Sequence, residues 1–162
     1  MEQLFSVLAA LQSTALPTAL RGSYYGYPLV NTGHIVGIAL LFGAIVPLDL
    51  RLLGLWPSVP VAALARILLP LAISGLILAV TTGSLMFSVS AVKYAGVGVF
   101  QLKMLLVLAA TANALLLSRV PGWSGEASAR PGIRLRVAFA AGLSIALWLA
   151  VILCGRTVAY LD

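Results

Sequence analysis

Two ionisable side chains stand inside long apolar stretches of this sequence. His34 lies in a run of uncharged residues between Arg21 and Asp49, and Lys103 interrupts an apolar stretch from about 97 to 118. In a lipid bilayer, an ionisable side chain near the centre costs roughly 2.5–3.5 kcal/mol or more when it has no partner. His34 and Lys103 are therefore the first candidates for chemistry.

The surroundings of His34 suggest two different roles. Gly33 and Gly37 form a Gly-xxx-Gly pair, which lets another backbone or a flat ligand come close. A neutral imidazole there is a candidate axial ligand for haem iron or a ligand for copper. The alternative is a hydrogen bond from the imidazole to a hydroxyl of a neighbouring helix, for which the candidates are Thr81, Thr82 and Ser84. Both interpretations stay open at this point.

Lys103 has three possible roles. Its four-carbon stem can carry the ammonium to the lipid headgroups. The ammonium can instead pair with a carboxylate, such as a haem propionate, or the uncharged amine can bind a metal. We expect no Asp or Glu of this chain at the same depth. A buried ammonium therefore needs a counter-charge from a ligand, a lipid or a partner chain.

Soft metal ligands gather towards the same ends of the apolar stretches. Together with His34 they form a possible copper set, completed by Met86, Met104 and Cys154. The chain has one cysteine and one histidine, which excludes an intrachain disulfide and a zinc cluster of Cys and His.

Asp49 and Arg51 follow Pro47 at the end of the first apolar stretch. Side chains two positions apart do not face each other on a helix. We therefore expect Asp49 to pair with Arg66 or Arg119 near the inner membrane boundary. Asp49, Arg51 and Arg66 are interpreted as structural residues that set the register of the helices.

The composition identifies the class of protein. Of the 162 residues, 62% are apolar and 9% are charged, and the mean hydropathy is +1.11. One soluble core cannot bury so much apolar surface under so few charges, so the solvent for most of the chain is lipid. The ten basic residues against four acidic ones indicate cytoplasmic loops and anionic lipid rather than nucleic acid.

We predict an all-α integral membrane protein with four transmembrane helices in an antiparallel bundle. The spans are expected at about 28–50, 64–88, 97–118 and 135–157, each long enough for roughly 20 helical residues. Both His34 and Lys103 then lie about six residues, or about 9 Å, inside the outer boundary. Polar span residues expected to hydrogen-bond between helices are Ser74, Gln101, Thr111, Asn113 and Ser144.

The positive charges predict the orientation of the chain. The connections after the first and third spans, including the inner loop 119–134, hold six arginines, whereas the opposite side holds three basic residues at its boundaries. Positive loops favour the cytoplasm. We therefore expect a multi-pass protein of the bacterial inner membrane with both termini on the periplasmic side.

Residues 2–20 are too polar for a good span. An apolar stripe of Leu4, Leu8, Leu11 and Ala15 predicts a short helix lying on the outer membrane surface, which Pro17 ends. We find no internal repeat and no second domain, and we expect residues 1–162 to form one membrane domain.

A family resemblance rests on YPLVNTGHIVGIALLFG at 27–43 and DLRLLG at 49–54. It continues through Leu69-Pro70, Thr82-Gly83 and FQLK at 100–103, and covers nearly all of residues 1–118. On these residues the chain resembles an uncharacterised family of short bacterial membrane proteins, which implies the fold and the location. A looser similarity, through His34 and Lys103, is to HemJ-type protoporphyrinogen oxidases, which bind haem b, and to CopD-like copper-resistance proteins.

These observations lead to three functional hypotheses. The first is a protein that holds haem b near its periplasmic face, with His34 as axial ligand, Lys103 as charge partner or second ligand, and the Gly33 and Gly37 face beside them. The second is a non-catalytic accessory subunit of a larger membrane complex or homo-oligomer. The third is copper handling or transport. An enzymatic activity is neither indicated nor excluded.

Overall fold

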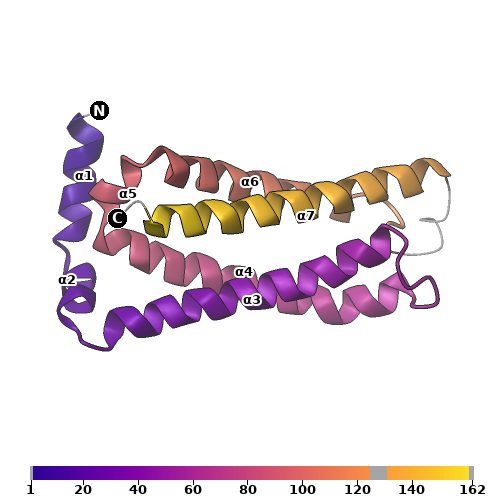
Figure 1. The fold of residues 1–162 in the computed structure, drawn as a ribbon, viewed down its shortest axis with the longest axis horizontal. Helices are drawn as coiled ribbons and strands as arrows, with labels where there is room; N and C mark the ends of the chain where they lie inside the picture. The colour runs from indigo at the N-terminus through magenta and orange to yellow at the C-terminus, as the bar shows by residue number, and fades with distance from the viewer. Residues whose placement is uncertain (1, 125–130, 161–162) are drawn as a thin grey trace. The chain divides into compact units, whose positions relative to one another are not determined.

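The computed structural model describes residues 2–124 and 131–160 and shows helices throughout (Figure 1). In chain order they are α1 (Glu2–Gln12), α2 (Ala15–Gly22), α3 (Gly26–Leu52), α4 (Val61–Val89), α5 (Ala91–Ala95), α6 (Gly98–Ser118) and α7 (Pro131–Tyr160). No strand occurs in the described part of the chain. The inner loop predicted at 119–134 falls partly outside these residues.

Four of these helices are long and apolar enough to cross a membrane. Within the described residues they are α3, α4, α6 and the segment Gly132–Val158 of α7. Helix α6 is apolar enough to span although it contains Lys103, because the mean hydropathy of 18 consecutive residues within it is 1.8. The predicted all-α membrane fold with four spans is confirmed, and each span lies within a few residues of its expected position.

The N-terminal segment differs from the single short helix that we expected. It forms α1 and α2, which meet at an angle of 57°. At the break, the hydroxyls of Ser13 and Thr14 donate to the carbonyls of Ala10 and Leu11, which also accept from the backbone N–H groups of the same two residues. Pro17 does not end a helix, because it lies in the first turn of α2, where its missing N–H leaves no helical bond unmade.

The contacts divide the chain into two compact units. The first comprises residues 1–41 and 73–98, and the second comprises residues 42–72 and 99–162. Helices α3 and α4 contribute to both units, so the boundary does not follow the helix ends. The expectation that residues 1–162 form one membrane domain stays a prediction.

In the first unit, α3 and α4 run antiparallel in close contact. His34 lies against Thr82, and Leu41 lies against Gly75, so the pairing proceeds in opposite directions along the two helices. Helix α1 contacts α5 and runs across the direction of the first turns of α3 (Figure 1).

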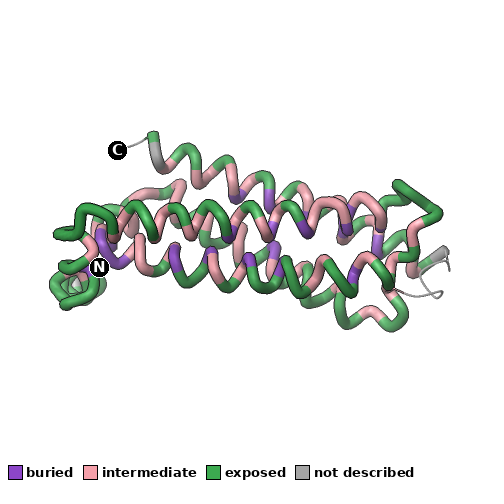
Figure 2. The backbone as a smooth tube through the Cα atoms, turned by 90° about the horizontal axis from the view of Figure 1, so that it is seen from below, coloured by how far each residue is buried: buried purple, intermediate pink, exposed green. Residues whose placement is uncertain are grey.

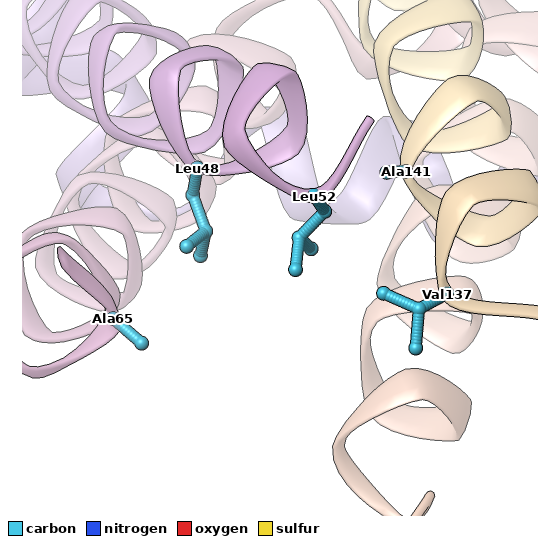
Figure 3. Close-up of a cluster of buried hydrophobic side chains, with 5 residues drawn as sticks. All are labelled: Leu48, Leu52, Ala65, Val137 and Ala141. Carbon is cyan, nitrogen blue, oxygen red and sulfur yellow. The ribbon is translucent and has the colours of Figure 1, made fainter. Parts of the chain in front are cut away.

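In the second unit, a cluster of buried apolar side chains joins several helices. Its members are Leu48 and Leu52 of α3, Ala65 of α4, and Val137 and Ala141 of α7 (Figure 3). Leu117 of α6 packs against the same cluster. Because two of the five buried members are alanine, the helices can approach closely there.

Buried positions recur between exposed ones along the long helices (Figure 2). Many of the exposed side chains are large and apolar: Ile67 is 70% exposed, Leu105 is 64% exposed and Phe139 is 71% exposed. Such surfaces match a lipid environment, in which apolar side chains on the outside of a helix carry no cost.

Candidate functional site

His34 makes hydrogen bonds to α4. Its Nδ1 atom lies 2.8 Å from the carbonyl oxygen of Ala79 and 3.3 Å from the hydroxyl oxygen of Thr82. A carbonyl only accepts, so Nδ1 carries a proton and donates it to Ala79. The Thr82 hydroxyl in turn donates to the carbonyl of Leu78, at 2.6 Å. The structure thus confirms the predicted contact between His34 and a hydroxyl of the next span.

Glycines allow the His34 ring to lie between the two helices. A Cβ atom on Gly83 would lie 2.9 Å from Cε1 of His34, and a Cβ on Gly33 would lie 3.1 Å from the Thr82 methyl carbon. On Gly37 a Cβ would lie 2.6 Å from the backbone nitrogen of Ala79. The structure shows the backbone of α4 close to Gly37 and the side chain of Thr82 close to Gly33.

Lys103 lies half-buried on α6 and reaches towards α7. Its Nζ atom is 3.4 Å from the position that a Cβ on Gly155 would occupy, which is an ordinary van der Waals distance, so the ammonium lies beside Gly155. The neighbouring titratable group is the Cys154 thiol. His34 belongs to the first compact unit and Lys103 to the second, so their predicted pairing stays a prediction.

The possible copper ligands are divided in the same way. His34 and Met86 belong to the first unit, whereas Met104 and Cys154 belong to the second. Cys154 is a free cysteine. Within residues 2–124 and 131–160, no group of three or more His, Cys, Asp or Glu side chains is placed to hold a metal ion.

Asp49 is the most buried ionisable residue that the sequence singled out. It is 4% exposed and its carboxyl group hydrogen-bonds to Ser144 of α7, which is equally buried. Its Oδ2 atom has no hydrogen-bond partner among the residues that the structure describes.

The expected ion pair between Asp49 and Arg66 or Arg119 is not found in the described part of the chain, and this prediction was wrong. Asp49 faces the bundle interior and α7, whereas Arg51 donates to the carbonyls of Val59 and Pro57 in the α3–α4 connection. Arg51 therefore holds the α3–α4 connection, and its expected role in the register of the helices stays a prediction.

A small cavity lies beside Asp49. Its volume is about 60 Å³, and all its lining residues belong to the second unit. The polar side chains that line it are Asp49, Asn113, Ser118, Ser144 and Trp123, and the apolar ones are Ile45, Leu48, Leu52, Leu69, Ala114 and Leu117. We name this space the Asp49 cavity.

Asn113 also joins two helices. Its side-chain amide donates to the carbonyl of Ala140 on α7, at 2.9 Å, which confirms its predicted interhelical bond. Sequence reasoning treated Asp49, Asn113 and Ser144 as separate structural residues. Helix position does not link them in the sequence, because Asp49 lies 3 residues from the end of α3 and Asn113 lies 5 from the end of α6, whereas Ser144 lies 13 from the start of α7.

No protein-family model, no curated protein and no solved structure matches this chain. The resemblance to a family of short bacterial membrane proteins therefore stays a prediction.

Proposed function

We propose that this protein holds haem b in the membrane, with His34 as the axial ligand of the iron. The supporting observation is the bond from His34 Nδ1 to the carbonyl of Ala79. Ligating histidines usually donate the N–H that faces away from the metal to a carbonyl or a carboxylate, which fixes the tautomer and the ring orientation. In the neutral ring the other nitrogen, Nε2, is then the one with a lone pair for iron.

The chain's own residues would position the ligand. Ala79 and Thr82 hold the His34 ring, and Gly83 makes room for it on α4. The face of Gly33 and Gly37 is occupied by α4, so these glycines position α4 and do not themselves contact the porphyrin. A bound haem would supply one-electron redox chemistry.

A comparison of three proteins tests this proposal. The wild-type protein, His34→Gln and His34→Ala are purified from a haem-replete bacterial host, and their absorption spectra are recorded. A glutamine amide can still donate to the Ala79 carbonyl but is not a good iron ligand, so it separates helix packing from ligation. We expect a Soret band in the wild type and none in either variant.

Three results would contradict the proposal. They are a colourless wild-type protein, an unchanged band in His34→Ala, or a band retained in His34→Gln.

A variant Lys103→Met tests whether Lys103 is a charge partner of haem or a second iron ligand. If Lys103 is a propionate partner, the band persists while the affinity for haem falls; if Lys103 is an iron ligand, the position of the band changes.

A second candidate function is that of an accessory subunit in a larger membrane complex or homo-oligomer. The observation in its favour is that two span glycines, Gly43 of α3 and Gly142 of α7, have open space where a Cβ would be. Small residues on an open helix face are typical of contacts between membrane helices. Mild-detergent extraction and native electrophoresis test this role, because migration as a single small protein would contradict it.

Copper handling by His34, Met86, Met104 and Cys154 is the third hypothesis. Metal analysis of the same preparation tests it, and equal copper content in wild type and Cys154→Ser would contradict this set.

The proposed location is the bacterial inner membrane with both termini in the periplasm. Reporter fusions at each terminus test the orientation, with alkaline phosphatase expected to be active and a cytoplasmic fluorescent protein expected to be dark.

A further inference from the structure

The Asp49 cavity contains an acidic side chain, and no basic side chain in the described part of the chain lines the cavity to balance its charge. Asp49 is 4% exposed, and one of its carboxylate oxygens has no hydrogen-bond partner within residues 2–124 and 131–160. The side chains that line the cavity include no lysine or arginine. A buried polar atom without a partner is uncommon in proteins and usually indicates a bound water or ion.

When the Asp49 carboxyl group is ionised, its charge makes an ion the better explanation. An unpaired carboxylate in an apolar bundle costs several kcal/mol, and intramembrane carboxylates often mark ion pathways. Arg51, the nearest basic residue in the sequence, donates to the carbonyls of Val59 and Pro57. The compensating charge is therefore expected to enter the cavity from outside the protein.

The other polar groups of the cavity suit a hard cation. The Ser118 hydroxyl donates to the carbonyl of Leu115, and the Asn113 amide nitrogen donates to that of Ala140, so the oxygens of these side chains keep lone pairs. The Ser144 oxygen also keeps lone pairs for a cation when its hydroxyl donates to Asp49. These are oxygen ligands, which hard cations prefer to imidazole or thiolate ligands.

The size and charge of the cavity favour a monovalent ion. The space of about 60 Å³ exceeds the roughly 10–15 Å³ that one water needs, so an ion with a few water molecules fits. One carboxylate balances one positive charge, whereas protein sites for Ca²⁺ and Mg²⁺ usually include more carboxylates or phosphates.

We propose that the Asp49 cavity is a binding site for a monovalent alkali cation, coordinated by Asp49 together with Ser144, Asn113 and Ser118. The site shares no residue with the proposed haem ligand His34 and does not depend on it. It differs from a purely structural carboxyl group, which would hold the helices together without exchanging an ion.

Thermal unfolding of the purified full chain in nanodiscs of uncharged lipid tests this site. The protein is compared in sodium chloride, potassium chloride and choline chloride at equal ionic strength. A cation that binds only the folded state raises Tm in a saturable manner. We expect sodium or potassium to raise the Tm of the wild type relative to choline, and Asp49→Asn to abolish the increase.

Two further variants test whether the cation effect comes from the Asp49 cavity. Ser144→Ala removes one expected ligand and should weaken the apparent cation affinity by at least about tenfold. Thr111→Val is the matched control, because the Thr111 hydroxyl donates to Val107 within α6 and does not line the cavity. We expect Thr111→Val to bind the cation as the wild type does.

Several results would overturn the proposal. They are equal wild-type Tm values in the three salts, a cation effect that persists in Asp49→Asn, or an infrared band of a protonated carboxyl that Asp49→Asn removes but sodium and potassium leave unchanged. If Asp49→Asn cannot be purified in folded form, Ser144→Ala decides the question. Unchanged cation affinity in that variant contradicts the site.

Discussion

His34 and Asn113 use the same kind of contact, although only one of them is a candidate for chemistry. Each donates a side-chain N–H to a backbone carbonyl of another helix, His34 to Ala79 and Asn113 to Ala140. Both acceptors are carbonyls of alanines, so a small residue lets the donor approach the neighbouring backbone. Asp49 is different, because its Oδ2 has no partner in the described part of the chain.

The interhelical bond of Asn113 should make a small, measurable contribution to stability. We expect Asn113→Ala to lower the free energy of unfolding by about 0.6 kcal/mol, the average for such bonds in membrane proteins. Unfolding in mixtures of mild detergent and dodecyl sulfate measures this change. Thr111→Val is the control, because it removes a bond within α6 only, and an equal loss in both variants would argue against the α6–α7 contact.

At the scale of elements, glycine determines how closely α3 and α4 approach. A Cβ on Gly75 would lie 2.5 Å from the backbone nitrogen of Leu41 and 2.8 Å from the carbonyl oxygen of Gly37. Neither backbone atom can rotate away, so the helices themselves would have to separate. A Cβ on Gly43, in contrast, would meet nothing within 4 Å.

We therefore predict different effects for two alanine substitutions. Gly75→Ala should destabilise the protein by about 1–3 kcal/mol, the usual cost of overpacking. Gly43→Ala should be neutral or slightly stabilising, because alanine favours helix and has space here. Thermal unfolding of both variants measures the difference, and similar Tm values for Gly75→Ala and the wild type would contradict the contact.

The spans were predictable from sequence, whereas their mutual contacts were not. Long uncharged runs and the length needed to cross a bilayer locate α3, α4, α6 and α7. The rotation of each helix about its axis is not encoded in hydropathy, since lipid and protein interior are equally apolar. Asp49 was therefore paired with arginines in the prediction, whereas its helix turns it towards Ser144.

Local polar chemistry at the N-terminus was also missed. The apolar stripe from Leu4 to Ala15 continues through the break at Ser13 and Thr14, so periodicity does not reveal that break. The side-chain hydroxyls of these residues compete with backbone donors and end α1. For His34, sequence reasoning named both the correct type of partner and the haem alternative, and the second of these is still to be tested.

At the scale of the whole molecule, packing rather than water exclusion separates core from surface. Leu48 is 4% exposed in the cluster with Leu52 and Ala65, and Leu105 is 64% exposed. Because lipid is as apolar as the core, moving a leucine between them gains little transfer free energy. What a buried leucine adds is close contact, and its loss leaves a cavity.

This difference predicts unequal effects of truncating two leucines. Leu48→Ala should cost about 1–3 kcal/mol, below the usual range for a water-soluble core because the transfer contribution is reduced. Leu105→Ala should change stability by less than about 0.5 kcal/mol. Dodecyl sulfate unfolding compares the two, and equal losses would indicate that the outer face of α6 is buried against a partner.

The absorption spectrum of the purified wild-type protein, recorded beside that of His34→Ala, tests the proposed function most directly. We expect a Soret band from haem b in the wild type and its loss in His34→Ala, with both proteins folded and equally pure. A colourless wild-type protein from a haem-replete host, or the same band in both proteins, would contradict it.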